Sequence, residues 1–298
     1  MAPLFAGSFD DFRIHFPHLV PPERTYDMVY VLRGKSVYEL YEVPYAPGSQ
    51  SVLWVIQEGA IVALHYVIDV GRAYERCDIM LEAQSSLYMY VECNNNELFP
   101  RMHINFYLAG NSSVSCFSTY MSTQTYPLEM NYACNMQGHY AQAFLYMLYG
   151  MSGTQNATIN TRQHHYVPHA QSLVSLKGVV ADKAHLAYNG RITIDKGAHY
   201  TNAEQQNKNM VWGNQARAVA TPSLEVNAHQ VQCKHGSATG YFDALHVFYM
   251  QSRGLDAQTV QQLLLNGFFQ DSIIKSDIEL WNESIAQNID AYVNRIVI

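Results

Sequence analysis

The segment Phe144-Leu-Tyr-Met-Leu-Tyr149 is apolar or aromatic at every position and is followed at once by Gly150. Val52-Leu-Trp-Val-Ile56 has the same character and is followed by Gly59 three residues later. Runs of this length are typical of β-strands, because an ordinary helix needs ten or more residues. Apolar residues at successive positions also indicate that both faces of the strand are buried. These segments therefore predict a β-protein with strands covered on two sides.

Similar short runs recur from about residue 28 to residue 226, separated by turn residues such as Gly110-Asn111 and Asn189-Gly190. The composition agrees, since 22 of the 298 residues are tyrosine, which favours strands. Two all-β folds fit this pattern: an antiparallel sandwich or barrel of hairpins, and a solenoid of stacked rungs. No short motif recurs at a fixed period, so the pattern alone does not choose between them.

The pattern changes after Pro222. Apolar residues at helical spacing predict one helix over residues 243–250 and another over residues 256–269, separated by Gly254 as a helix stop. A further amphipathic run begins at Ser276. We therefore expect three parts, namely an N-terminal segment 1–27, a β-body 28–240 and a helical segment 241–298.

The overall charge excludes several classes of partner. With 18 Lys and Arg against 25 Asp and Glu, the formal net charge is −7, which gives no general attraction to nucleic acid or to anionic lipid. The longest apolar stretch, residues 52–70, contains too many polar side chains to span a membrane. Five cysteines without CxxC spacing, and no visible export signal, predict a cytoplasmic protein with free thiols.

Familiar catalytic motifs are absent from the sequence. There is no GxxxxGK[ST] loop, no GxGxxG after a strand, no HExxH and no GxSxG elbow. We therefore expect no nucleotide to bind this chain and predict that it is not an enzyme.

The clearest group of ligand-type side chains is Val231-Gln-Cys-Lys-His-Gly236. In a strand, Cys233 and His235 point to the same face and Lys234 to the opposite one, so a thiolate and an imidazole can share one metal ion. Two donors do not complete a metal site, and others must come from elsewhere in the fold or from a second chain. The alternative interpretation is a buried cysteine beside an ordinary surface histidine.

A second histidine group contains His164, His165 and His169. No acidic residue stands beside these histidines in the sequence to orient the imidazoles, which favours a polar turn with Tyr166 packed inward over a metal site or proton relay. Four other cysteines are expected to be interior residues on successive rungs; they are Cys77, Cys93, Cys116 and Cys134.

Longer segments between residues 164 and 269 carry a resemblance to a known family. They include His165-Tyr-Val-Pro-His-Ala-Gln-Ser172, Ala198-His-Tyr-Thr-Asn-Ala-Glu-Gln-Gln-Asn-Lys-Asn-Met210, Val231-Gln-Cys-Lys-His-Gly-Ser-Ala-Thr-Gly240 and Phe248-Tyr-Met-Gln-Ser-Arg-Gly-Leu255. In order and spacing this part resembles the SufB/SufD family of iron–sulfur cluster assembly proteins. The resemblance implies a mainly β fold, a right-handed parallel β-helix with a C-terminal helical segment. It also implies a non-catalytic scaffold that carries a transient iron–sulfur cluster or iron.

The Cys233-Lys-His235-Gly segment looks like the SufD branch, in which it lies near the interface with SufB. The resemblance implies that His235, and then Cys233, are iron or cluster ligands, and that the partners are a SufC-like ABC ATPase and a SufB-like or identical subunit. On the helical segment it implies ATPase-binding residues Arg253, Gly254, Leu263, Leu264 and Phe268.

The chain departs from the family pattern at two points. Lys234 stands where a small serine is usual, and the helical N-terminal region is reduced, which is compatible with a divergent member that forms a homodimer. Two other hypotheses are a β-helix enzyme acting on acidic polysaccharide and a purely structural subunit in which Cys233 and His235 only pack.

Overall fold

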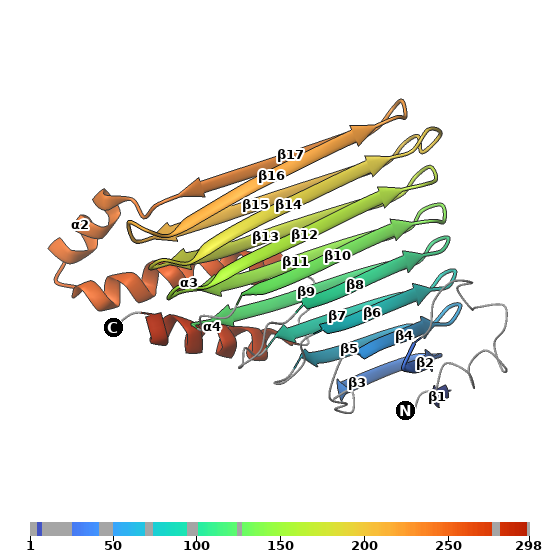
Figure 1. The fold of residues 1–298 in the computed structure, drawn as a ribbon, viewed down its shortest axis with the longest axis horizontal. Coiled ribbons are helices and arrows are strands. Elements are labelled where there is room, and N and C mark those ends of the chain that lie inside the picture. Colours follow the sequence, from blue (N-terminus) through green and yellow to red (C-terminus); the bar gives the residue numbers. More distant parts are fainter. Residues whose placement is uncertain are drawn as a thin grey trace.

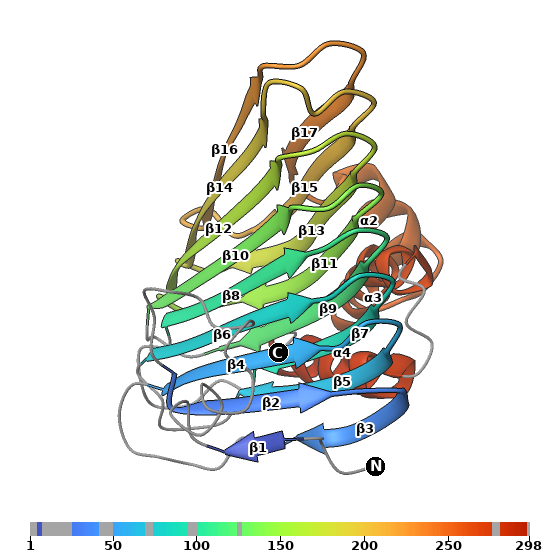
Figure 2. The ribbon, with the colours of Figure 1, turned by 90° about the vertical axis from the view of Figure 1, so that its right-hand side faces the viewer.

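The computed structural model describes residues 5–7, 26–41, 50–68, 74–93, 101–123, 127–275 and 281–296. Within these ranges the chain forms a parallel β-helix followed by three helices (Figures 1 and 2). The expectation of a parallel β-helix is confirmed, and the sandwich or barrel of antiparallel hairpins is wrong.

The chain alternates between two sheets, so that each pair of strands adds one rung. In spatial order, the first sheet contains β1 (Phe5–Gly7), β2 (Met28–Leu32), β4 (Gln50–Ile56), β6 (Tyr74–Leu81), β8 (Arg101–Leu108), β10 (Leu128–Met136), β12 (Asn156–His165), β14 (His185–Ile194) and β16 (Arg217–Val226). The second contains β17 (Gln232–Gly240), β15 (Asn202–Trp212), β13 (Gln171–Ala181), β11 (Gln142–Met151), β9 (Ser113–Ser122), β7 (Ser86–Cys93), β5 (Ile61–Ile68) and β3 (Lys35–Tyr41). Among the described strands, only the β1–β2 pair is antiparallel.

Alternate side chains point into the space between the sheets and form one continuous apolar core. The four cysteines that were expected inside all lie in this core, with thiols that are not in disulfides. Strands that are apolar at every position have their outer face covered as well. On β4, for example, Leu53 and Val55 pack beside Tyr26, while Leu148 of β11 lies under the C-terminal helices.

The three helices are α2 (Ala244–Ser252), α3 (Ala257–Lys275) and α4 (Asn282–Ile296). The Asp243 side chain caps α2 by accepting a hydrogen bond from the backbone N–H of Leu245, at 2.8 Å. Gly254 then takes a φ of +93°, which suits glycine at a helix end. The start of the third run, expected at Ser276, lies outside the described residues.

Helices α3 and α4 cover the outer face of the second sheet. Ile285 and Tyr292 of α4 pack with Tyr90 and Phe117 of the sheet, and Leu265 of α3 joins the same cluster. In contrast, α2 buries no residue and projects away from the solenoid (Figure 1). Of the helices that the structure describes, none is long and apolar enough to cross a membrane.

Candidate functional site

The end of the solenoid at β16 and β17 is open. These strands come last in the two sheets, and within the described chain each pairs with one neighbouring strand, β14 or β15 (Figure 2). The inner residues of β15 are buried, whereas most residues of β17 are exposed. The last rung therefore leaves its inner face accessible.

Cys233 and His235 lie on this inner face. The parallel register pairs Cys233 with Ala203 and His235 with Gln205. Because Ala203 and Gln205 are buried and point inward from β15, Cys233 and His235 point inward as well. Cys233 also packs against a buried cluster that contains Ala203 together with Ile192 of the opposite sheet, which agrees with an inward direction. The structure thus brings the two residues to one face, as the spacing indicated.

The two side chains have different surroundings. Cys233 is half-buried, and burial raises the pKa of its thiol, so a bound cation is needed to favour the thiolate at neutral pH. His235 is exposed. Lys234 is exposed on the opposite face, in register with Glu204, and so does not approach the thiol from the same side. Among the described residues, no three His, Cys, Asp or Glu side chains gather into a metal site.

The β16 side of the open end is apolar. The inward-facing residues of β16 lie in register with inward-facing residues of β14, Leu224 with Ile192 and Val226 with Ile194. Ile192 and Ile194 are buried, whereas Leu224 and Val226 are each 39% exposed because no further rung covers them. The open end therefore combines an apolar wall with a thiol and an imidazole.

The second histidine group includes the expected turn after β12, but two of its contacts differ from the expectation. His164 Nε2 lies 2.9 Å from a carboxylate oxygen of Asp195, which the next rung supplies from 31 residues away. Tyr166 does not pack inward; it is exposed and stacks on His164 with ring centroids 3.8 Å apart. His169 stacks between two exposed tyrosines on the turns of the solenoid. The acidic partner was missed because rung stacking, and not sequence proximity, supplies it.

The expected ATPase-binding residues divide into two groups. Leu263 is exposed, as are Arg253 and Gly254. Leu264 is only half-exposed, and Phe268 packs against the body of the protein, with the Lys177 ammonium 4.6 Å above its ring. These last two are therefore less available to a partner.

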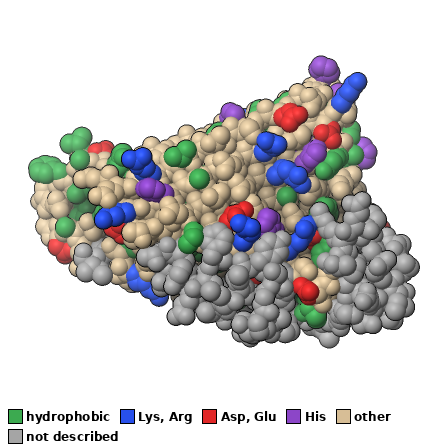
Figure 3. Space-filling view, in the orientation of Figure 1, with side chains coloured by type: hydrophobic (Ala, Val, Ile, Leu, Met, Phe, Trp, Pro, Cys, Tyr) green, Lys and Arg blue, Asp and Glu red, His purple; other side chains and the backbone are tan. Residues whose placement is uncertain are grey.

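A larger apolar surface lies on α2, which we call the α2 face. It consists of Leu245, Phe248 and Tyr249, of which Leu245 is 74% and Phe248 69% exposed. Apolar side chains gather at this end of the molecule in Figure 3. The helical spacing of these residues was visible in the sequence, but spacing does not tell whether an apolar face is covered.

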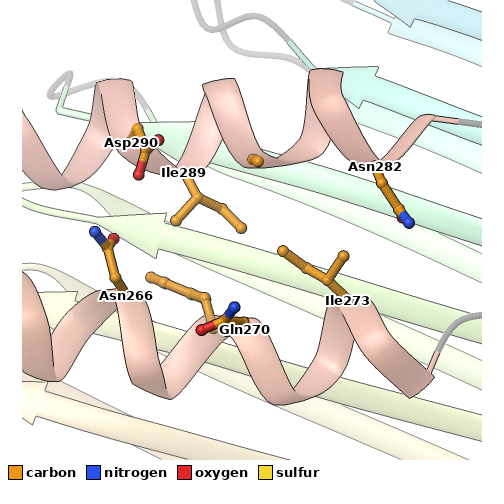
Figure 4. Close-up of a pocket in the computed structure, with 8 residues that line it drawn as sticks. Asn266, Gln270, Ile273, Asn282, Ile289 and Asp290 are labelled. Carbon is orange, nitrogen blue, oxygen red and sulfur yellow. The ribbon is translucent and has the colours of Figure 1, made fainter. Parts of the chain in front are cut away.

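A cavity of about 420 Å³ lies between α3 and α4 (Figure 4). Ile273 and Ile289 line it from the two helices, and Asn266, Gln270 and Asp290 supply polar atoms. None of its lining residues belongs to β16 or β17, so it is separate from the Cys233–His235 pair.

Comparison with known proteins bears on this arrangement. Residues 71–268 match the family model described as SUF system FeS cluster assembly, SufBD core domain. The chain belongs to the SufBD family. The match includes both strands of the open end, the whole of α2 and the part of α3 up to Phe268.

Individual SufBD relatives are similar over shorter stretches. The chain is 35% identical to the iron–sulfur cluster assembly protein SufD of Escherichia coli over 92 residues, which are 31% of this chain and 22% of that protein. It is 28% identical to SufD of Bacillus subtilis over 127 residues, 43% of this chain and 29% of the relative. A SufBD family protein of Synechocystis is 34% identical over 101 residues, 34% of this chain and 22% of its own length. The chain thus aligns with less than a third of the length of each.

Proposed function

We propose that this SufBD family chain is a SufD-like, non-catalytic scaffold subunit that holds an iron–sulfur cluster or its iron transiently at the open end of the solenoid. The observation that carries the proposal is the placement of Cys233 and His235 on one accessible inner face. A thiolate and an imidazole together are an established ligand set for iron in clusters. The family match and the similarity to two SufD proteins support the same function.

A second subunit is needed to complete this site. Cys233 and His235 supply two donors, whereas the irons of a cluster need more, and no third His, Cys, Asp or Glu accompanies them in the described chain. The partner we propose is a SufB-like subunit or a second copy of this chain, seated on β16 and β17. The unpaired strand edges and the exposed Leu224 and Val226 suit pairing with another strand.

We assign nucleotide hydrolysis to a separate SufC-like ATPase in the cytoplasm, because the sequence of this chain contains no nucleotide-binding loop. The exposed α2 face, together with Leu263, is the surface we propose for that partner. A large exposed apolar patch on a helix that buries none of its residues is typical of a protein–protein contact.

Anaerobic reconstitution with iron and sulfide tests the ligand role. The parent chain and His235→Ala are compared, alone and with a SufB-like subunit, by the visible absorption of the cluster. Lys234→Ala is the matched control, since Lys234 lies on the same strand but on the opposite face. We expect His235→Ala to lose most of the cluster and Lys234→Ala to retain it. Equal yields from the parent and His235→Ala would contradict the ligand role and support the purely structural subunit.

A further inference from the structure

The inner face of the second sheet changes character directly beneath the open end. Strand β13 places Val174, Leu176 and Gly178 inward. The next strand, β15, places Gln205, Asn207 and Asn209 in register with them. All three amides are buried, with Gln205 only 1% exposed. A polar layer therefore begins directly under His235 and continues under Ser237 and Thr239.

Two of these amides form a closed network. Asn209 Nδ2 donates to Asn207 Oδ1 at 2.6 Å and to the hydroxyl of Thr239 at 3.1 Å. Asn207 Nδ2 donates to the Tyr149 hydroxyl at 3.2 Å, and this hydroxyl donates in turn to Asn209 Oδ1. Their burial is explained by bonds within the protein.

Gln205 is different, because its Oε1 is buried and the described residues give it no hydrogen-bond partner. The amide end of the side chain crosses the interior to Gly190, and a Cβ there would collide with Nε2 of Gln205. Glycine at position 190 thus makes room for the amide, with Nε2 facing Gly190. An unsatisfied buried carbonyl destabilises a fold, so its presence here calls for a reason other than packing.

The strand register places Gln205 directly beside His235 of the proposed iron site. Gln205 pairs with His235 across a parallel ladder, in which neighbouring strands lie about 4.8 Å apart. A histidine that binds a metal through one ring nitrogen generally donates its other N–H to an acceptor, which fixes the ring orientation. A carboxamide oxygen is such an acceptor.

We infer that Gln205 is a positioning residue for His235, whose Oε1 accepts the imidazole N–H that does not face the metal when the site is loaded. This inference rests on the proposed function, because it presumes that His235 binds a metal. It accounts for the three observations on Gln205, namely its burial, its unpaired oxygen and its register with His235.

Anaerobic titration of the 298-residue chain with Co²⁺ tests this role, since the thiolate-to-cobalt absorption reports binding at Cys233. Gln205→Met keeps the length of the side chain but removes the acceptor. Gln206→Met is the matched control, because Gln206 is the exposed neighbour that points outward from the same strand. Gln205→Ala, which is too small to contact Gly190, repeats the measurement should the methionine variant fold poorly.

We expect Gln205→Met to weaken the apparent Co²⁺ affinity about tenfold or more, the usual effect of losing such a partner, and Gln206→Met to leave it unchanged. Without Co²⁺, the unfolding midpoint of Gln205→Met should equal or exceed that of the parent, because an unsatisfied oxygen is removed. In the His235→Ala background the Gln205→Met substitution should have no further effect on Co²⁺ binding, since the two residues act together.

The outcomes separate this inference from the function on which it rests. Parent-like affinity in Gln205→Met and Gln205→Ala, with His235→Ala still defective, overturns only the role of Gln205. If Gln205→Met weakens Co²⁺ binding equally in the His235→Ala background and also lowers the unfolding midpoint, Gln205 serves packing, and its positioning role is overturned. If the parent shows no Cys233-dependent absorption, or His235→Ala titrates like the parent, the ligand role itself is wrong.

Discussion

His165 lies inside the solenoid, with Nε2 2.8 Å from Ser172 Oγ and with Nδ1 lacking a hydrogen-bond partner in the described part of the chain. Burial lowers the pKa of this imidazole from 6.5 to about 3, with a smaller contribution from His164. The folded protein therefore holds the ring neutral at pH values at which the unfolded chain protonates it. A residue placed inside by strand alternation thus makes folding sensitive to acid.

At the residue scale, we predict that His165 reduces stability as the pH falls below 6.5. The unfolded state binds the proton and the folded state does not, so the free energy of unfolding decreases from pH 6.5 down to about 3. Between pH 6.5 and 5 the loss should be about 2 kcal/mol from this residue. Urea unfolding of the parent and His165→Gln at several pH values measures it, with the exposed His139→Gln as control. A His165→Gln variant as acid-sensitive as the parent would exclude this cause.

At the scale of elements, α2 and α3 have similar apolar spacing but different environments. Leu265 and Phe269 of α3 are fully buried against the second sheet, whereas α2 buries nothing. The difference arises from position, because α3 runs along the sheet after the turn at Gly254, whereas α2 projects away from the solenoid (Figure 1). Helical spacing indicates that a face is apolar, and the tertiary structure decides whether the protein itself covers it.

For these helices we predict that Phe248→Glu on the α2 face weakens binding of a SufC-like ATPase about tenfold or more, because a charge would enter an apolar contact. Leu263→Glu should act in the same direction. Tyr88→Glu is the control, since Tyr88 is an exposed aromatic residue on β7, far from α2 in sequence. Calorimetric titration measures the affinity, and circular dichroism checks the fold. Unchanged affinity in both helix variants would contradict the assignment of the α2 face and Leu263 to ATPase binding. Phe268→Glu is not used, because Phe268 packs against the body and its substitution would disturb the fold.

At the scale of the whole molecule, the two proposed partner surfaces lie on different parts of the protein. The open end is formed by β16 and β17, and the α2 face belongs to the helical segment that follows them. Each rung of a solenoid contacts mainly its neighbours, so a change at the last rung should remain local. The division at residues 27 and 240 into three parts stays a prediction.

We therefore predict that Leu224→Asp combined with Val226→Asp prevents pairing with a SufB-like subunit or with a second copy. Burying two carboxylates against an apolar surface is strongly unfavourable, and both residues lie on the exposed inner face of β16. Light scattering after size exclusion gives the assembly mass, and ATPase binding through α2 should persist as the internal control. Pairing that survives both substitutions would place the subunit interface elsewhere.

The sequence by itself determined the local features of this protein. Runs of five or six apolar residues predicted strands, and Gly254 marked the end of the first helix. Cys233 and His235 are two positions apart in a strand, which placed them on one face. These features depend on contacts within a few residues, which are readable in the order of side chains.

Only the tertiary structure decided which residues from different rungs meet. Asp195 reaches His164 from 31 residues away, and Gln205 lies beneath His235 from the preceding rung. No repeated motif marks the rungs in the sequence. The register between neighbouring rungs therefore could not be read from the order of residues. The physical reason is that a solenoid brings side chains together at the strand spacing, whatever their separation along the chain.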